Sequence, residues 1–149
     1  MDKTENRSMQ IKGTFKANIQ LLWDIWTKPE HLKNWWGPKG FSATIHKIDL
    51  QAGGEWKLTL HGPDGKNYAN RSIFKEIIPL EKIVFEHFNP HFFTTVLFEA
   101  QDEETQINWT MLFDTPEMRE TIVKVHKAEE GQKENMERLG EYLLKVHTQ

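Results

Sequence analysis

Cysteine is absent from the 149-residue sequence, which excludes a disulfide framework, a thiolate metal site and a cysteine nucleophile. A long apolar run is absent too, so no segment has the apolar length that a membrane-spanning helix needs. The first residues, MDKTENRS, lack the apolar stretch of a secretory signal. We therefore expect a cytoplasmic protein without a membrane span.

Excess positive charge is missing as well. The chain carries 19 Lys and Arg residues against 22 Asp and Glu residues, which gives a formal net charge of -3 at pH 7. A protein that binds the phosphate backbone of a nucleic acid needs a clustered basic face. The sequence therefore predicts no nucleic-acid partner.

Three common functional motifs do not occur in the sequence. It has no G-x-S-x-G elbow, no G-x-G-x-x-G turn and no phosphate-binding P-loop. Gly53 and Gly54 stand between two strand-like segments, which indicates a tight turn instead of a phosphate site. His87 and His91 flank the turn at Asn89–Pro90, so their spacing does not define a metal-binding helical face. We predict no catalytic residue, no metal and no cofactor.

Aromatic residues, in contrast, are plentiful. The chain has 6 Trp and 9 Phe residues, and aromatic residues make up 11% of it. Such large side chains lie either in a core or along the wall of a cavity. A chain of this length buries roughly 70% of its unfolded surface, so a substantial core is expected.

The start of the chain predicts a lead-in followed by a strand. Residues 1–8 are charged or small, and we expect them to be a flexible lead-in. Apolar and polar residues alternate over 9–17, which is the period of a half-buried strand. No composition break or repeat marks a linker after that point. Residues 9–149 are therefore expected to form a single domain.

Two short helices are expected next. Asn18 is placed to cap an amphipathic helix that begins at Ile19. A second helix follows over Pro29–Trp36, because proline suits the first turn of a helix. Thr27 is its expected cap, and the run ends at Gly37.

Strand-like segments with turn residues between them fill the middle of the chain. They are residues 41–50, 55–62, 67–78, 82–88, 91–100 and 105–113. The turn Pro63-Asp64-Gly65 is a typical hairpin connection. Consecutive strands joined by short turns predict an antiparallel meander. Beyond Pro116 the pattern predicts one long helix, interrupted only by Gly131.

One face of the predicted sheet is apolar and rich in aromatic residues. Alternation places Trp56, Phe85 and Trp109 on this face. These rings are either ordinary core or the lining of a pocket, and the pattern fits both. His87 falls on the same face, either as a core histidine with its own partners or as a group that binds a ligand.

Further polar residues are candidates for the inward face. They are Tyr68, Asn70, Ser72 and Thr94. The segment 67–78 fits either phase of a strand, and a shift of one residue would send all its side chains to the opposite face. The inward position of these groups therefore depends on the register.

Several spaced elements resemble one known family. They are Trp26-Thr27, Pro29-Glu30, Trp36-Gly37-Pro38, Asp49-Leu50, Gly53-Gly54, Glu76-Ile77, Gly131, Leu139 and Leu143. They span nearly the whole chain and resemble the family named for the activator of heat-shock protein 90 ATPase. The resemblance implies the α+β helix-grip fold, which this family shares with the birch pollen allergen and with lipid-transfer domains related to the steroidogenic acute regulatory protein. In that fold, a curved antiparallel sheet of about seven strands wraps on a long C-terminal helix, with two short helices after strand one.

The C-terminal helix departs from the family pattern at one position. In similar domains a glycine is usually followed by Trp, whereas Gly131 is followed here by Gln132. The exchange implies a larger pocket, a partly polar pocket, or the loss of a Trp that packed at an end of the helix.

The apolar face and the resemblance together predict a ligand-binding domain. The expected ligand is a small hydrophobic or amphipathic molecule, such as a lipid, a fatty acid or an aromatic metabolite, held between the sheet and the C-terminal helix. The expected ligand-binding residues are Trp36, Phe41, Trp56, Leu58, Tyr68, Ser72, Phe85, His87, Trp109, Met111, Met136 and Leu139.

Two other functions stay open at this point. The resemblance implies a co-chaperone-like activator of a heat-shock protein 90 ATPase, with that chaperone as partner and a role in the stress response. Related helix-grip domains also imply a cyclase or hydrolase for a polyketide-like substrate, with His87 as the acid-base group. We expect a monomer or a homodimer.

Overall fold

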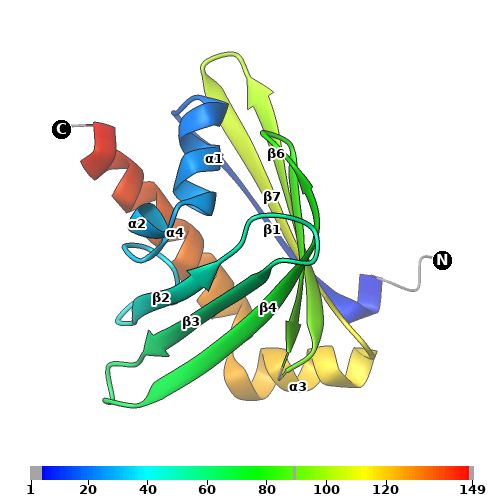
Figure 1. Cartoon of the computed structure of the whole chain (residues 1–149). Coiled ribbons are helices and arrows are strands. Elements are labelled where there is room, and N and C mark those ends of the chain that lie inside the picture. The colour runs from blue at the N-terminus through cyan, green and yellow to red at the C-terminus, as the bar shows by residue number, and fades with distance from the viewer. Residues whose placement is uncertain (1–4, 89, 148–149) are drawn as a thin grey trace.

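The computed structural model describes residues 5–88 and 90–147 (Figure 1). A curved sheet and a long C-terminal helix against its concave side are its main parts (Figure 1). The elements in chain order are η1 (Glu5–Arg7), β1 (Ser8–Phe15), α1 (Ile19–Thr27), α2 (Pro29–Leu32), β2 (Ser42–Ile48), β3 (Glu55–His61), β4 (Asn67–Ile78), β5 (Lys82–Phe88), β6 (Phe92–Gln101), β7 (Glu104–Phe113), α3 (Pro116–His126) and α4 (Ala128–His147).

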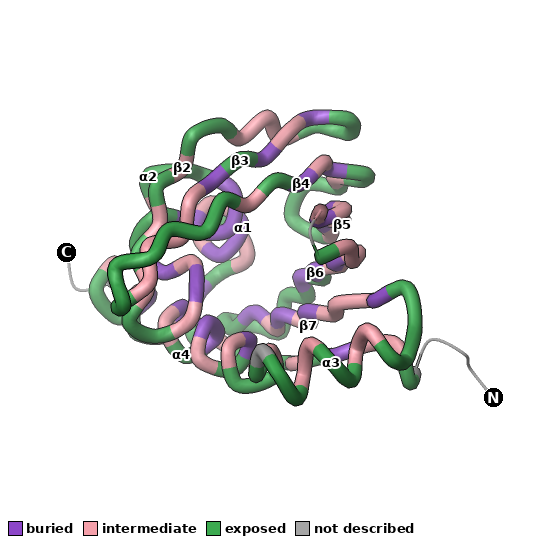
Figure 2. The backbone as a smooth tube through the Cα atoms, turned by 90° about the horizontal axis from the view of Figure 1, so that it is seen from below, coloured by how far each residue is buried: buried purple, intermediate pink, exposed green. Residues whose placement is uncertain are grey.

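All seven strands belong to one antiparallel sheet with the order β1-β7-β6-β5-β4-β3-β2. Each strand from β2 to β6 pairs with the next strand along the chain, and β1 pairs with β7. The register shifts between Ile45 and Lys47 in β2 and between Phe74 and Glu76 in β4, and such irregularities bend a strand. The sheet curves round α4 (Figures 1 and 2). The predicted α+β helix-grip fold is confirmed.

The second helix is shorter than the sequence predicts. Helix α2 ends at Leu32, and the chain then turns through Trp36 instead of continuing as a helix. Thr27 does not cap it, because its hydroxyl donates to the carbonyl oxygen of Trp23 at 2.7 Å. Asn18 does cap α1 as predicted, since its side chain accepts from Leu21 N.

The C-terminal segment is two helices and not the single long helix that the pattern predicts. The break lies at Lys127, whose φ of 52° is left-handed, and its backbone N–H donates to the carbonyl oxygen of Ile122. Gly131, the expected interruption, lies inside α4. Helix α3 therefore crosses the end of the sheet while α4 follows its concave side (Figure 1). No helix within residues 5–88 and 90–147 is long and apolar enough to cross a membrane.

Regular structure begins earlier than residue 9, where the sequence places the start of the first strand. Residues 5–7 form a 3₁₀ turn and Ser8 already belongs to β1. Arg7 donates to the carbonyl oxygen of Phe113 at 3.0 Å, which ties this turn to the end of β7. Residues 1–4 of the expected lead-in lie outside the described residues.

Large apolar side chains fill the space between α4 and the sheet at one end. The Trp26 ring meets the rings of Trp35 and Phe98 edge-on, with centroid distances of 4.8 Å and 6.2 Å. Leu139 and Leu143 of α4 are buried in the same cluster. We call this region, with these five residues, the packed end.

Helix α4 presents different residues to the sheet nearer its start. These are Ala128, Gly131, Gln132 and Asn135, which are small or polar. Gln132 reaches the carbonyl oxygen of Trp109 on β7, but Ala128, Gly131 and Asn135 fill less of the space beside the sheet than Leu139 does about one to three turns later. We call the region beside these four residues the hollow end.

Candidate ligand-binding cavity

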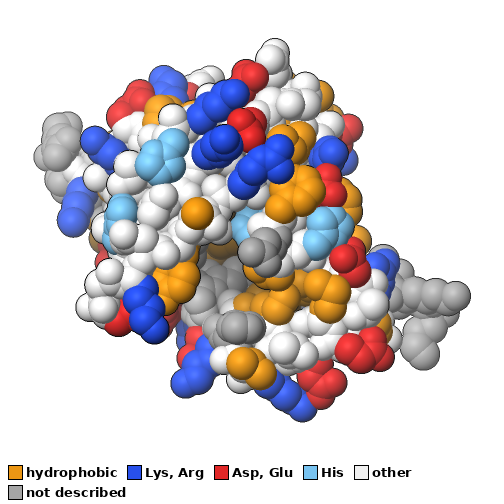
Figure 3. Space-filling view, turned by 60° about the horizontal axis from the view of Figure 1, so that its bottom comes forward, with side chains coloured by type: hydrophobic (Ala, Val, Ile, Leu, Met, Phe, Trp, Pro, Cys, Tyr) orange, Lys and Arg blue, Asp and Glu red, His pale blue; other side chains and the backbone are white. Residues whose placement is uncertain are grey.

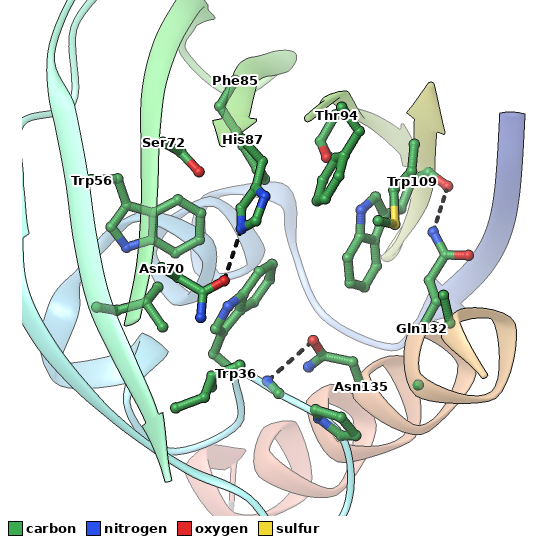
Figure 4. Close-up of a pocket in the computed structure, with 18 residues that line it drawn as sticks. Trp36, Trp56, Asn70, Ser72, Phe85, His87, Thr94, Trp109, Gln132 and Asn135 are labelled. Carbon is green, nitrogen blue, oxygen red and sulfur yellow. Dashed lines mark hydrogen bonds between the residues drawn. The ribbon is translucent and has the colours of Figure 1, made fainter. Parts of the chain in front are cut away.

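A cavity of about 170 Å³ lies at the hollow end (Figure 4). Strands β3 to β7, the loop after α2 and the first turns of α4 form its wall. The surface is hollowed on this side, with hydrophobic side chains along the edge of the hollow (Figure 3). The lining residues are Trp36, Gly37, Pro38, Trp56, Leu58, Leu60, Asn70, Ser72, Phe85, His87, Phe92, Thr94, Trp109, Met111, Ala128, Gly131, Gln132 and Asn135.

Three tryptophans from different elements form an aromatic wall. The Trp36 ring lies between those of Trp56 and Trp109, with centroid distances of 5.1 Å and 5.5 Å. Trp36 and Trp109 are stacked at an interplanar angle of 28°. On the far side Trp26 of the packed end meets Trp109 edge-on at 5.5 Å. The wall is therefore continuous with the core and offers flat apolar area to a ligand.

The aromatic wall contains buried polar atoms without partners. The indole nitrogens of Trp56 and Trp109 are buried and have no hydrogen-bond partner in the part of the chain that the structure describes. A buried donor without an acceptor costs about 1–3 kcal/mol. Ring packing, and not hydrogen bonding, therefore holds these two indoles in place.

Two polar side chains of α4 hold the loop that carries Trp36. Asn135 donates from Nδ2 to the carbonyl oxygen of Trp35 at 2.8 Å and accepts at Oδ1 from Gly37 N at 3.2 Å. Arg138 donates from Nη1 to the carbonyl oxygens of Gly37 at 2.9 Å and Trp36 at 3.3 Å. Burial lowers the pKa of the Arg138 guanidinium, which nevertheless stays protonated. The position of Trp36 in the wall thus depends on α4.

Polar side chains form a stripe across the concave face of β4, β5 and β6. The stripe consists of Asn70, Ser72, His87 and Thr94. Ser72 is the register partner of His87, and Thr94 is that of Phe85. Ser72 is 3% and Thr94 1% exposed, and neither hydroxyl makes a hydrogen bond within the described residues. Each hydroxyl therefore finds a partner only through the cavity.

His87 is held by hydrogen bonds on both sides of its ring. Its Nδ1 lies 2.8 Å from the carbonyl oxygen of Pro90 and its Nε2 lies 2.8 Å from Oδ1 of Asn70 (Figure 4). Because a carbonyl only accepts, Nδ1 is the donor. Burial lowers the pKa of His87, although the Pro90 carbonyl opposes this, so the ring is neutral at pH 7. In the structure Asn70 presents Oδ1 to Nε2 and donates from Nδ2 to the carbonyl oxygen of Tyr68 at 3.1 Å. A neutral ring accepts at Nε2, so it requires the amide of Asn70 to turn its NH₂ toward the ring and to give up the bond to Tyr68.

His91, four residues later, is not among the residues that line the cavity, and its pKa shifts in the opposite direction from that of His87. Its Nε2 is 2.6 Å from Glu86 Oε2 and its Nδ1 is 2.8 Å from Asp114 Oδ1. The hydrogen bond with Glu86, with a further contribution from Asp114, raises the pKa of His91. The same contact lowers the pKa of Glu86.

Gln132 lines the cavity from the side of α4. It is buried, and its Nε2 donates to the carbonyl oxygen of Trp109 at 3.2 Å (Figure 4). The residue that departs from the family pattern therefore borders the cavity, where an amide replaces the expected indole. The amide of Gln132 is therefore one of the polar groups at the cavity wall.

The structure places most of the expected ligand-binding residues along the cavity. Those that line it are Trp36, Trp56, Leu58, Ser72, Phe85, His87, Trp109 and Met111. Strand alternation brings them together, because they stand at inward positions of β3, β4, β5 and β7, apart from Trp36 on its loop.

The remaining expected residues do not line the cavity. Tyr68 shares the phase of Ser72 on β4 but stands near the strand end and is 44% exposed. Phe41 precedes β2 and packs toward Tyr68, with a centroid distance of 6.1 Å. Met136 and Leu139 are buried in the core farther along α4. A ligand contact by any of these four residues stays a prediction.

Other lining residues are not among the expected ligand-binding set. Asn70 and Thr94 are only candidates for the inward face in the sequence, and the register of β4 and β6 places both at the cavity. The loop residues Gly37 and Pro38, together with Asn135 of α4, carry no sequence signal of a pocket. Their position depends on the contact between that loop and α4, which is distant in sequence.

Comparison with known families agrees with this architecture. Residues 16–144 match the family described as Activator of Hsp90 ATPase homolog 1-like protein. The chain belongs to this family. The resemblance that the spaced sequence elements indicate is thereby confirmed. No protein with curated annotation matches the sequence at a significant level.

Solved structures share the fold of this Hsp90 ATPase activator-like chain. A protein from Nitrosomonas europaea has a TM-score of 0.89 at 21% identity, with 100% of both chains covered. A protein from Arthrobacter aurescens has a TM-score of 0.89 at 24% identity, with 97% of this chain and 90% of the other covered. A protein of the same family from Silicibacter pomeroyi has a TM-score of 0.76 at 16% identity, with 94% and 99% covered. At these identities the likeness concerns the fold alone.

Proposed function

We propose that the protein binds a small, largely apolar molecule in the cavity at the hollow end. The observation that carries this proposal is the cavity of about 170 Å³ with an aromatic wall and a few convergent polar groups. Apolar lining with a small number of placed polar side chains is the usual composition of a small-molecule site. The proposal also fits the general ligand-binding character of helix-grip domains.

The size of the cavity narrows the choice among the ligand classes. An apolar cavity of about 150 Å³ in another protein is large enough to hold benzene. A cavity of about 170 Å³ therefore suits a molecule with about one ring. Of the lipid, fatty acid and aromatic metabolite that the sequence suggests, the volume favours the aromatic metabolite.

The test uses p-xylene as a neutral one-ring probe and the indole N–H signals of ¹⁵N-labelled protein as the readout. We expect the signals of Trp56 and Trp109 to shift on titration, while that of Trp35 at the packed end stays unchanged. The signal of Trp35 is an internal control, because its indole nitrogen donates to the carbonyl oxygen of Ile25. Unchanged signals for both cavity tryptophans at saturating p-xylene would contradict the proposal.

A matched pair of variants separates binding in the cavity from binding elsewhere. Gly131 lines the cavity, and a Cβ atom added to it would lie 3.8 Å from Pro38 Cγ, which is an ordinary van der Waals contact. Gly131→Ala should therefore keep p-xylene binding, whereas the larger side chain of Gly131→Leu should occupy the space and abolish it. Equal binding by the two variants would show that the probe binds at another site.

Docking on a heat-shock protein 90 chaperone is the second candidate function. The observation that favours it is the family match over residues 16–144, since the family is described by activation of the Hsp90 ATPase. Such docking would use the outer surface, so Gly131→Leu should stimulate the purified chaperone as well as the wild type does. No stimulation of the ATPase by the wild type would exclude this function for the chaperone tested.

Catalysis with His87 as acid-base group finds less support. Both of its ring nitrogens are engaged, and it is the only titratable side chain among the described residues that line the cavity. An acid-base mechanism needs a free group within reach of the substrate proton.

Cytoplasmic location, a role in the stress response and a monomeric or homodimeric state stay predictions, which fractionation and native mass spectrometry would test.

A further inference from the structure

We propose that the ligand is an uncharged ring compound with two oxygen groups at opposite ends, held by the hydroxyls of Ser72 and Thr94 on either side of β5. This inference rests on the proposed function and adds the chemical class of the ligand. Ser72 and Thr94 become the residues that determine specificity, while the tryptophan wall provides the apolar contact.

The first observation is that both hydroxyls lack partners. Ser72 and Thr94 are buried, line the cavity and make no hydrogen bond within residues 5–88 and 90–147. The fully buried side-chain atoms without a partner in the described residues are the indole nitrogens of Trp26, Trp56 and Trp109, so the two hydroxyl oxygens are not sealed in the core. By contrast, the other polar groups of the stripe, Asn70 and His87, bond to each other. Hydroxyls that face a cavity without a protein partner are available to a ligand.

The second observation is the separation of the two hydroxyls. Ser72 lies on β4 opposite His87, and Thr94 lies on β6 opposite Phe85. Two strand spacings of about 4.8 Å each and an offset of two residues along the strands place their Cα atoms about 12 Å apart. Each O–H···O hydrogen bond spans about 2.7 Å. The remaining distance corresponds to a body about one ring wide, and the residues between them, Phe85 and His87, present their side chains to that body (Figure 4).

The third observation is the absence of full charge around the cavity. Among the described lining residues none is Asp, Glu, Lys or Arg. An ionised ligand without a counter-charge would lose far more hydration than a neutral hydroxyl or carbonyl does. His87 cannot take the role of a counter-charge while both of its nitrogens are bonded to Pro90 and Asn70. The oxygen groups of the ligand are therefore neutral, as in a phenol or an aryl carbonyl.

The experiment uses three probes of nearly equal size, p-xylene, p-cresol and hydroquinone, in which hydroxyl groups replace methyl groups one at a time. Dissociation constants are measured by NMR titration for the wild type, Ser72→Ala and Thr94→Val. Comparing each variant with the wild type removes the difference in hydration among the probes. The matched controls are Ser42→Ala and Thr95→Val, which remove hydroxyls outside the cavity, at an exposed position of β2 and on the opposite face of β6.

We expect the Kd for hydroquinone to rise about tenfold in Ser72→Ala and in Thr94→Val, because each variant removes one hydrogen bond. The Kd for p-xylene should stay unchanged or fall, and the controls should match the wild type for every probe. A second readout is stability: Thr94→Val should unfold at the same temperature as the wild type or higher, because a hydroxyl without a partner is replaced by a methyl group. A hydroxyl with a purely structural role would give a lower unfolding temperature.

The outcomes separate this inference from the proposed function. If p-xylene binds and the variants leave the Kd for hydroquinone unchanged, the cavity is a binding site and the inference is overturned. If p-xylene binds and hydroquinone does not, the inference is overturned in the same way. If no probe binds to the wild type, the proposed function fails and the inference fails with it.

Discussion

The two ends of helix α4 face the same sheet. Apolar side chains fill the space between helix and sheet at one end, and a cavity occupies it at the other. At the packed end Leu139 and Leu143 of α4 are buried against the sheet and help to complete the core. At the hollow end Gly131 and Asn135 occupy equivalent inward positions, and a cavity lies beside them. The cavity therefore follows from a change in side-chain size along a regular helix and does not need an unusual backbone.

The sheet shows a similar change from core residues to cavity-lining residues along strand β6. Its inward residues Phe98 and Val96 are buried in the core, whereas Thr94 lines the cavity. Unpaired polar atoms occur at both ends, because the buried indole nitrogen of Trp26 at the packed end lacks a partner in the described part of the chain, as do those of Trp56 and Trp109 at the cavity. Free space, and not the presence of unpaired polar atoms, therefore distinguishes the hollow end from the packed end.

The largest effect should come from a matched pair of leucines. Leu139 is 0% and Leu58 3% exposed, but only Leu58 lines the cavity. Leu139→Ala should lower the free energy of unfolding by about 2–5 kcal/mol, with Leu58→Ala near the lower limit because its side chain already lacks neighbours on one side. Urea unfolding followed by circular dichroism measures both. A larger loss for Leu58→Ala would contradict the distinction between the two ends.

Loosening the loop that carries Trp36 should have the next effect. Arg138→Met keeps an unbranched apolar stem but removes the guanidinium that donates to the carbonyl oxygens of Gly37 and Pro38. We expect the free energy of unfolding to fall by about 1–3 kcal/mol and the affinity for p-xylene to fall with it. Lys133→Met, at an exposed position of the same helix, is the control. The role given to Arg138 would be wrong if both variants behaved alike.

Restoring a large side chain to the hollow end should affect binding more than stability. Gln132→Trp places an indole beside the cavity, where the family resemblance implies one. We expect the free energy of unfolding to change by less than about 1.5 kcal/mol, because the new ring fills existing space. The affinity for p-xylene should fall at least about tenfold, equivalent to about 1.4 kcal/mol. Retained affinity in a folded variant would mean that the indole packs elsewhere.

The smallest effects should be on the pH dependence of stability. His87 and His91 should contribute to it with opposite signs. The pKa of His87 is lowered by burial, so the unfolded state takes up a proton first and stability falls as the pH drops below about 6.5. The pKa of His91 is raised, mainly by Glu86, so its contribution is complete below about pH 6.5 and is lost as the pH rises through the folded-state pKa.

Thermal unfolding of His87→Gln and His91→Gln at pH 5.5 and pH 8 tests this contrast. The stability advantage of the wild type over His91→Gln should grow on acidification, and its advantage over His87→Gln should shrink. If the stability advantage of the wild type changed in the same direction for both variants, the assignment of one histidine to the cavity and the other to surface carboxylates would be contradicted.

Strand alternation makes much of the fold predictable. The predicted strands agree with β2 to β7 to within a residue or two at most ends, because one face of the sheet is apolar and the turns carry proline, glycine or acidic residues. The break between α3 and α4 is not predictable, for a physical reason. Lys127 adopts a left-handed conformation without a glycine or proline beside it, so only the packing of two helices on different parts of the sheet requires the break there.

The cavity is predictable from the strands and less so from the helix. Alternation identifies the inward residues of β3, β5 and β7, but it does not say how far along an element the cavity extends. Leu139 and Gly131 share one face of α4, and only the three-dimensional structure distinguishes the filled part of that face from the hollow part. The loop contacts of Arg138 and Asn135 join residues about a hundred positions apart, which no local pattern reveals.

The most direct test of the contrast between the two ends is a crystal structure of the protein under xenon pressure, because xenon enters apolar cavities and is excluded from close-packed cores. The account predicts xenon against the aromatic wall of Trp36, Trp56 and Trp109, and none between Trp35 and Leu139. A cavity without xenon, or xenon at the packed end, would contradict it.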